Sequence, residues 1–200
     1  MTFLSKLIFL ITRPQVIAIV DTGEVSLAKN IYKMLKARFG AIVIEFGREK
    51  SHNKNKAEEF KFFLRKSTRS ILIINDFGDI SLNDISKIIV ALPPAGRLIL
   101  NYDKEAIRQL KGKSSSQVLT FGLAEQKENL IGPELQASDI RFTDNGLTFK
   151  LNYRGSSVPI WLANSSSRED IYPVLAGIGA GVSLNVNLVE LSRVLSADSP

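Results

Sequence analysis

The sequence predicts an α/β fold in which a mostly parallel sheet is followed by a small antiparallel hairpin element. Over the first 122 residues, short apolar runs rich in β-branched residues alternate with segments of helical spacing. After them, short runs are separated by turn residues. The first pattern is typical of βαβ units and the second of hairpins. Because 44% of the 200 residues are hydrophobic and 23% are charged, the chain can bury a core of its own.

The first strand is expected at 16–20, a Val-Ile-Ala-Ile-Val run that ends at Asp21-Thr22-Gly23. A run that is apolar at every position is typical of a strand buried on both faces. Apolar residues at helical spacing follow over 26–38. A strand, a turn with a glycine and a helix therefore open the chain.

Four more strands and three more helices are expected before residue 122. Each expected strand has an apolar centre, and each helix segment has apolar residues three or four positions apart. The expected strands are 41–45, 71–74, 97–101 and 117–121, and the expected helices are 57–66, 82–92 and 104–110.

The rest of the chain predicts a hairpin element and two closing helices. Asp144-Asn145-Gly146 separates two short apolar runs and is a strong hairpin signal. The first closing helix is rich in alanine and glycine, so we expect it to pack very close to the sheet, although each glycine costs about 1 kcal/mol of helix propensity. The expected strands are 140–142, 147–153 and 158–162, and the expected helices are 168–182 and 188–195.

The composition excludes several kinds of chemistry and leaves others open. The chain has no cysteine and one histidine, which excludes thiol catalysis, disulfides, thiolate metal sites and two-histidine zinc sites. The net charge is +6, and the basic excess lies within residues 1–70. Such a field attracts nucleotides, nucleic acid or anionic lipid. Nucleic acid is the less favoured of these, because Phe60, Phe62 and Phe63, which lie among the basic residues, are expected to face the core.

No segment of the sequence is expected to span a membrane. The apolar stretch from Phe3 to Ile11 contains Lys6 and is shorter than the roughly 20 residues that a span needs. We expect an amphipathic lead-in helix there, and a cytoplasmic protein.

The order of the motifs resembles the central, ATP-binding domain of the Mur ligase family. The resemblance rests on the run Asn101-Tyr102-Asp103 after a strand and on Val118-Leu-Thr-Phe-Gly122 in the next one. It also rests on Asp139-Ile-Arg-Phe142 in the hairpin and on Ile171-Tyr-Pro-Val-Leu-Ala-Gly-Ile178 in the later helix. Within the family, the likeness is strongest to the enzyme that adds D-alanyl-D-alanine to the UDP-muramoyl-tripeptide.

The resemblance implies a P-loop-like topology and one unit over residues 1–200. Its expected parts are a lead-in helix at 1–13, a parallel α/β part at 14–122, an antiparallel insert at 135–163 and closing helices at 168–195. The family's flanking domains, one for the UDP-sugar and one for the incoming amino acid or dipeptide, have no counterpart in this sequence.

The family's chemistry is ATP-dependent amide formation in peptidoglycan precursor synthesis, which implies ATP and Mg²⁺ as cofactors. The implied nucleotide-binding residues are Thr22, Gly23, Ser26, Asn101 and Asp103, and Ser26 stands at the metal-hydroxyl position. No catalytic residue can be assigned.

The sequence departs from the family pattern where a phosphate-binding turn should read Gly-x-x-Gly-Lys-Thr. Val25 stands where the phosphate lysine is expected, and Asp21 and Glu24 stand near the expected glycines. Two carboxylates have the wrong sign for a triphosphate, although a bound Mg²⁺ would reverse that sign locally. The family's His-Asn pair matches Glu169-Asp170 here, and Ile85 stands where a modified lysine is expected.

Two functions therefore stay open. One is an ATP-dependent acid–amino-acid ligase, and the other is a non-catalytic binding or scaffolding module or one piece of a split ligase, with a separate protein supplying the missing domains. Single residues have two interpretations as well. Asn101 and Asp103 suit a strand-end turn as well as a nucleotide contact. Ser26 suits a helix N-cap as well as a metal ligand, and Asp76 a solvated loop as well as an acidic metal-binding segment.

Overall fold

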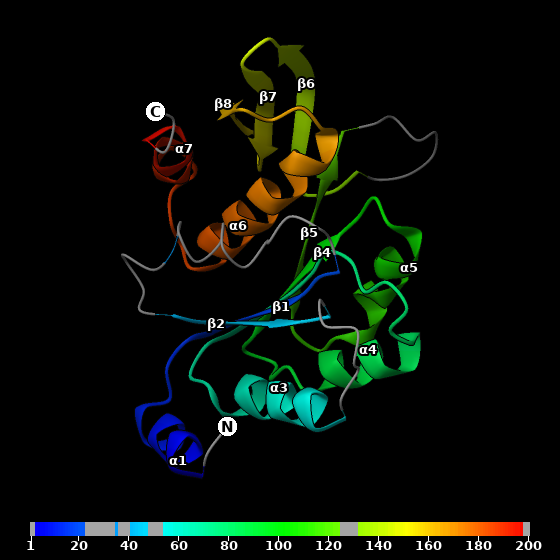
Figure 1. The fold of residues 1–200 in the computed structure, drawn as a ribbon, viewed down its shortest axis with the longest axis vertical. Coiled ribbons are helices and arrows are strands. Elements are labelled where there is room, and N and C mark those ends of the chain that lie inside the picture. Colours follow the sequence, from blue (N-terminus) through cyan, green and yellow to red (C-terminus); the bar gives the residue numbers. More distant parts are fainter. Residues whose placement is uncertain (1–2, 23–34, 36–40, 48–53, 125–131, 198–200) are drawn as a thin grey trace.

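The computed structural model describes residues 3–22, 35, 41–47, 54–124 and 132–197, and its centre is one eight-stranded sheet (Figure 1). The strands are β1 (Val16–Val20), β2 (Ile42–Phe46), β3 (Ser70–Ile74), β4 (Arg97–Asn101), β5 (Gln117–Leu123), β6 (Leu135–Thr143), β7 (Gly146–Tyr153) and β8 (Ser156–Ala163). Their order is β2-β1-β3-β4-β5-β6-β7-β8. Pairing is parallel from β2 to β6 and antiparallel from β6 to β8. The predicted fold class is confirmed.

Helices cover both faces of the parallel part of the sheet. Figure 1 shows α3, α4 and α5 on one side and α6 on the other, with α7 beside β8 and α1 at a corner. Their bounds are α1 (Phe3–Thr12), α3 (Lys54–Lys66), α4 (Leu82–Val90), α5 (Glu105–Arg108), the 3₁₀ helices η1 (Gln109–Lys113) and η2 (Arg168–Asp170), α6 (Ile171–Ser183) and α7 (Leu188–Ala197).

Each face of the sheet has its own core, because successive strand residues point to opposite faces. In β1, Ile17 and Ile19 join the core under α6 and α7, whereas Val16, Ala18 and Val20 join the core under α1, α3, α4 and α5. All five residues of β1 are buried, as the continuous apolar run predicts.

The hairpin element is part of the main sheet. β6 begins at Leu135, before the expected 140, and its first residues pair in parallel with β5, Leu135 opposite Phe121. The register then shifts between Ser138 and Arg141, where Asp139 has a φ of 52°. This bulge bends the strand, so that β6 leaves β5 and continues as the first strand of the hairpin.

The alanine- and glycine-rich helix packs close to the sheet, as expected. A Cβ atom on Gly179 would lie 3.2 Å from Ile99 Cγ2 and 3.4 Å from Leu119 Cδ2. The larger side chains that usually fill such an interface have no room there, which explains the small residues of α6. The helix expected at 26–38 lies outside the described residues, apart from the buried Leu35.

Candidate functional site

Polar residues at the carboxyl ends of β1, β3 and β4 form one hydrogen-bonded series. Asn75 Nδ2 donates to Asp21 Oδ1 over 3.0 Å, and Asn101 Nδ2 donates to Asn75 Oδ1 over 2.9 Å. The three strands are parallel neighbours, so their carboxyl ends meet at one edge of the sheet. In open α/β sheets this edge is the one that binds ligands.

Asp103 extends this series of hydrogen bonds to the face of the sheet that α6 covers. Its backbone N–H donates to Asn101 Oδ1 over 3.1 Å. Its Oδ2 atom accepts from the Leu123 backbone N–H at 2.7 Å and from the Tyr172 hydroxyl at 3.0 Å. We call Asp21, Asn75, Asn101, Asp103 and Tyr172 the strand-end ladder. It joins three parallel strands to the end of β5 and to the first turn of α6.

Burial makes the ladder's pairing important. Asp21 and Asn101 are each 1% exposed, and a carboxylate out of water is costly unless it accepts hydrogen bonds. An asparagine amide both donates and accepts, so Asn75 gives its N–H to Asp21 and its oxygen to Asn101. The two amides therefore link an acid at the end of β1 to an acid beyond β4.

Gly122 is required by the position of Asp103. A Cβ atom on Gly122 would lie 2.7 Å from Asp103 Oδ1 and 2.9 Å from its Cγ. The Phe-Gly sequence in β5 thus leaves the space that the Asp103 carboxylate occupies. Two motifs of the sequence resemblance, Asn-x-Asp and Phe-Gly, meet in this contact.

A second pair lies beside the ladder. Lys104 Nζ forms a hydrogen-bonded ion pair with Asp76 Oδ2, and the Gly78 backbone N–H donates to Asp76 Oδ1 over 3.0 Å. Burial raises the pKa of Asp76, but the hydrogen bonds from Lys104 and Gly78 outweigh burial and hold that pKa below its ordinary value. The pair ties the loop after β3 to the residue that precedes α5.

Thr22 lies at the same edge between two loops. Gly47, with a φ of 117°, follows β2, and Gly78, with a φ of 48°, follows β3. A Cβ atom on either glycine would lie within 3.3 Å of a Thr22 side-chain atom. Only glycine adopts such backbone angles readily, so these two turns can approach Thr22 closely.

The structure brings together three of the residues predicted to bind a cofactor, namely Thr22, Asn101 and Asp103. Gly23 and Ser26, including the predicted metal role of Ser26, lie outside the described residues, as does Val25. Among the described residues, no three His, Cys, Asp or Glu side chains form a group that could hold a metal ion.

Sequence reasoning missed Asn75 and Tyr172. Asn75 had a usable signal, because it directly follows the 71–74 strand at the ligand-binding edge. Tyr172 had none, because its distance from Asp103 depends on how α6 packs. Of the positions that depart from the family pattern, Ile85 is buried in the core under α4, and Asp170 caps η2 by accepting from the Ser167 backbone N–H.

Comparison with solved structures shows which fold this chain has. The chain superposes on a crystal structure of MurF from Acinetobacter baumannii with a TM-score of 0.74, over 95% of this chain and 46% of that one, at 12% identity. The chain has a Mur ligase fold.

Other Mur ligases agree. MurF from Thermotoga maritima in complex with ADP gives a TM-score of 0.65 at 14% identity, over 90% of this chain and 48% of that one. MurC from Thermotoga maritima gives 0.67 at 13% identity, over 97% of this chain and 47% of that one. The chain thus spans about half the length of these Mur ligases. This agrees with the Mur-ligase-like central domain expected from the sequence.

Sequence comparison leads to the same family. A 102-residue segment is 24% identical to UDP-N-acetylmuramoyl-L-alanyl-D-glutamate–2,6-diaminopimelate ligase 2 of Clostridium acetobutylicum. The segment is 51% of this chain and 20% of that ligase. No protein-family model matches the chain.

Among the described residues at this edge of the sheet, carboxylates outnumber cations. The strand-end residues Asp21–Thr22, Asn75–Asp76 and Asn101–Lys104 contain three carboxylates and one ammonium group, and that ammonium group is paired with Asp76. Asp21 and Asp103 already accept the ladder's hydrogen bonds. A triphosphate placed against this edge would meet carboxylates of its own sign.

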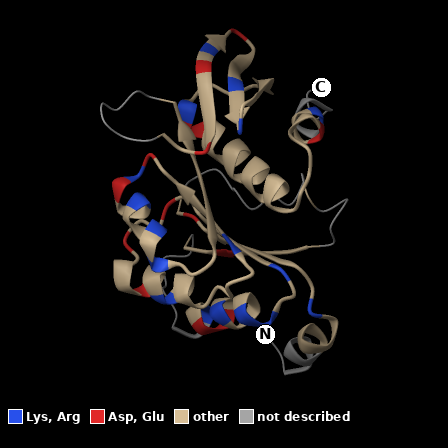
Figure 2. Ribbon diagram, turned by 180° about the vertical axis from the view of Figure 1, so that it is seen from behind, with Lys and Arg blue, Asp and Glu red and all other residues tan. Residues whose placement is uncertain are grey.

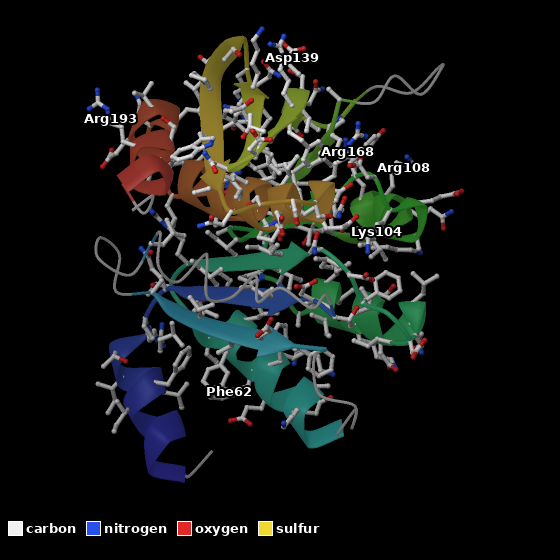
Figure 3. The ribbon with its side chains drawn as sticks, turned by 45° about the horizontal axis from the view of Figure 1, so that its top comes forward. Phe62, Lys104, Arg108, Asp139, Arg168 and Arg193 are labelled. Carbon is white, nitrogen blue, oxygen red and sulfur yellow. The ribbon has the colours of Figure 1, made fainter. Side chains whose placement is uncertain are left out.

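Two more cations lie on this side of the molecule. Figure 3 shows Lys104, Arg108 and Arg168 toward the side to which the parallel strands point. The Arg108 guanidinium lies over the Tyr102 ring, 5.3 Å from its centroid, and donates to the Tyr102 carbonyl oxygen at 3.4 Å. Arg108 is therefore held at the outer side of the loop that follows β4.

Proposed function

We propose that this chain is the nucleotide-binding-fold domain of a Mur-type ligase in which ATP chemistry is impaired, and that it works as a binding module. The observation that carries the proposal is the strand-end ladder. Its carboxylates and amides are hydrogen-bonded to one another at the edge of the sheet where a nucleotide would bind. The substitution of Val25 for the phosphate lysine supports the same conclusion. A domain of this kind would keep the scaffold and the ligand-binding edge without transferring phosphate.

Active ATP-dependent acid–amino-acid ligation is the second candidate function. It is favoured by coverage of nine-tenths of the chain by a MurF structure in complex with ADP, and by the cations Lys104, Arg108 and Arg168 on the nucleotide side. In that case a separate protein or a further part of the chain would supply the other substrate-binding domains.

Thermal unfolding in the presence of Mg-ATP distinguishes the two candidates. A ligand at about 100 times its Kd stabilises a protein by about 2.7 kcal/mol, which gives a large shift in Tm. We expect millimolar Mg-ATP to shift Tm no more than Mg²⁺ alone. A clear additional shift with Mg-ATP would contradict impaired nucleotide binding and support the ligase.

A gain-of-function variant makes a negative result informative. Val25→Lys restores the missing cation, and we expect it to produce a Tm shift with Mg-ATP that the native chain lacks. Val90→Lys on α4 adds the same charge at a side chain that is 72% exposed, and should produce none. If both variants behave alike, the turn at 21–26 is not a modified phosphate cradle.

A further inference from the structure

Helix α1 is largely apolar. Its ten residues, Phe-Leu-Ser-Lys-Leu-Ile-Phe-Leu-Ile-Thr, include seven large apolar side chains and no acid. The apolar face of an amphipathic helix is normally covered, by protein or by lipid. The cover that the rest of the chain gives α1 is therefore informative.

Among the side chains of α1 that the structure describes, those of residues 8–12, Phe9 is buried and the others are exposed. Phe9 is 4% exposed, and its ring centroid lies 4.7 Å from that of Phe63 and 6.1 Å from that of Phe62 on α3. Ile8 and Ile11, in contrast, are 53% and 76% exposed. Figure 1 shows α1 at a corner of the molecule, and Figure 3 shows Phe62 on α3 close to it.

Exposed cations lie beside the C-terminal end of α1. Arg13 follows α1 directly, and the Thr68 hydroxyl donates to its carbonyl oxygen over 2.9 Å, which holds the turn after α3 beside the end of α1. Arg65, Lys66 and Arg69 come from the end of α3 and from this turn, and all are exposed. Residues 1–20 and 60–75 contain no Asp or Glu. Figure 2 shows Lys and Arg along α3 and on the segments next to α1.

We propose that Ile8, Ile11, Arg13, Arg65, Lys66 and Arg69, which we call the α1 surface, bind an anionic lipid membrane. Isoleucine side chains enter the boundary between headgroups and acyl chains, and neighbouring cations meet the lipid phosphates. α1 lies along the membrane surface in this arrangement. None of the described helices is long and apolar enough to cross a bilayer.

The side chains favour lipid over nucleic acid as the occupant. Single-stranded nucleic acid binds through aromatic rings on which bases stack. Here the phenylalanines near the cations turn inward: Phe60 and Phe63 are buried, and Phe62 packs against the same core. The apolar side chains of the α1 surface, Ile8 and Ile11, are aliphatic, and aliphatic side chains partition into lipid.

Flotation with lipid vesicles tests the proposal on the whole chain. We expect binding to vesicles of phosphatidylcholine with phosphatidylglycerol, and at least fivefold weaker binding to phosphatidylcholine alone. Arg65→Glu should weaken binding to the anionic vesicles at least fivefold, which corresponds to about 1 kcal/mol for one cation near the surface. Ile11→Asp should weaken it by a similar factor or more, because it places a charge in the apolar face.

Matched controls separate the α1 surface from general effects. Val90→Asp puts the same charge at another exposed aliphatic residue, and Lys111→Glu reverses an exposed cation on η1; neither should change vesicle binding. Far-UV circular dichroism and Tm show that each variant is folded. Equal binding to both vesicle types would overturn the proposal, and so would a single-stranded oligonucleotide that binds more tightly than the vesicles. A dimer that Ile11→Asp dissociates, without vesicle binding, would assign the surface to a second copy of the chain instead.

Discussion

The Tyr172 hydroxyl donates a hydrogen bond to Asp103 Oδ2 over 3.0 Å, and this contact joins α6 to the loop that follows β4. The two residues come from opposite ends of the sequence pattern, a strand-end motif and the start of an alanine-rich helix. Through Asp103 the hydroxyl is connected to Asn101, Asn75 and Asp21. The position of α6 and the shape of the candidate site therefore depend on each other.

Removing the Tyr172 hydroxyl should destabilise the fold, because it removes the hydrogen bond to Asp103. We expect Tyr172→Phe to lower the free energy of unfolding by roughly 1.5–3 kcal/mol, the range for a hydrogen bond to a charged group. In a double-mutant cycle with Asp103→Asn, urea denaturation should give a coupling energy of about 1 kcal/mol or more. Additive effects of the two substitutions would mean that the contact contributes nothing to stability.

Filling the space beside Asp103 should also destabilise the fold, by adding an atom where Tyr172→Phe removes one. Gly122→Ala would bring a methyl group to within 2.7 Å of Asp103 Oδ1, so the carboxylate must move away from its donors. We expect a loss of roughly 1–3 kcal/mol, as for other overpacked positions. Gly112→Ala is the matched control, because a Cβ atom there has no neighbour within 4 Å. Equal denaturation midpoints for the two variants would contradict the proposed close contact.

A third substitution tests the hydrogen bond that Asn75 donates to Asp21. Asn75→Asp replaces the donor that faces Asp21 Oδ1 at 3.0 Å with a second carboxylate. Two unit charges about 4 Å apart repel by about 4 kcal/mol at an effective dielectric constant near 20, so the variant should be strongly destabilised at neutral pH.

The stability of Asn75→Asp should depend on pH. Repulsion raises the pKa of the new pair in the folded state above the unfolded value, so the penalty should grow as pH rises above about 4 and shrink below it. Urea denaturation of the variant and the native chain at several pH values measures this difference. Asn187→Asp, which keeps an acceptor for the Val189 backbone N–H, should change stability by less than about 0.5 kcal/mol. A penalty independent of pH would exclude charge repulsion as its cause.

The sequence predicted the central strands β1, β3 and β4 well because they are buried on both faces. The bounds of β1 and β4 match the expected strands at 16–20 and 97–101, where every residue except the partly buried Arg97 is buried. The start of β6 was missed because its first residues, Leu135 to Ser138, alternate in burial and include polar side chains. A pattern of apolar runs has no signal for such a strand, nor for the bulge at Asp139 where β6 leaves β5.

The candidate site was predictable where a motif lies at the end of a strand. Asn101 is the last residue of β4 and Asp103 lies two residues beyond it, and parallel topology places both at the ligand-binding edge. Tyr172 reaches that edge only through the packing of α6, which depends on long-range contacts such as that of Gly179 with Ile99. No local pattern contains that distance.

The ion pair of Asp76 with Lys104 should make the free energy of unfolding depend on pH. Burial raises the pKa of Asp76, but the hydrogen bonds from Lys104 and Gly78 outweigh it, so the folded pKa lies below the ordinary value of about 3.9. A group with a lowered folded pKa contributes its stability above the unfolded pKa and loses it as pH falls through the folded pKa.

The native chain should therefore exceed Asp76→Asn in unfolding free energy near neutral pH, and the difference should shrink below about pH 4. In the Lys104→Met background, Asp76→Asn should make a smaller difference at neutral pH, because the main group that favours the ionised carboxylate is absent. Denaturation of all four proteins at both pH values measures these differences, and a gap between the native chain and Asp76→Asn that stays constant down to about pH 2 would contradict the ion pair's role.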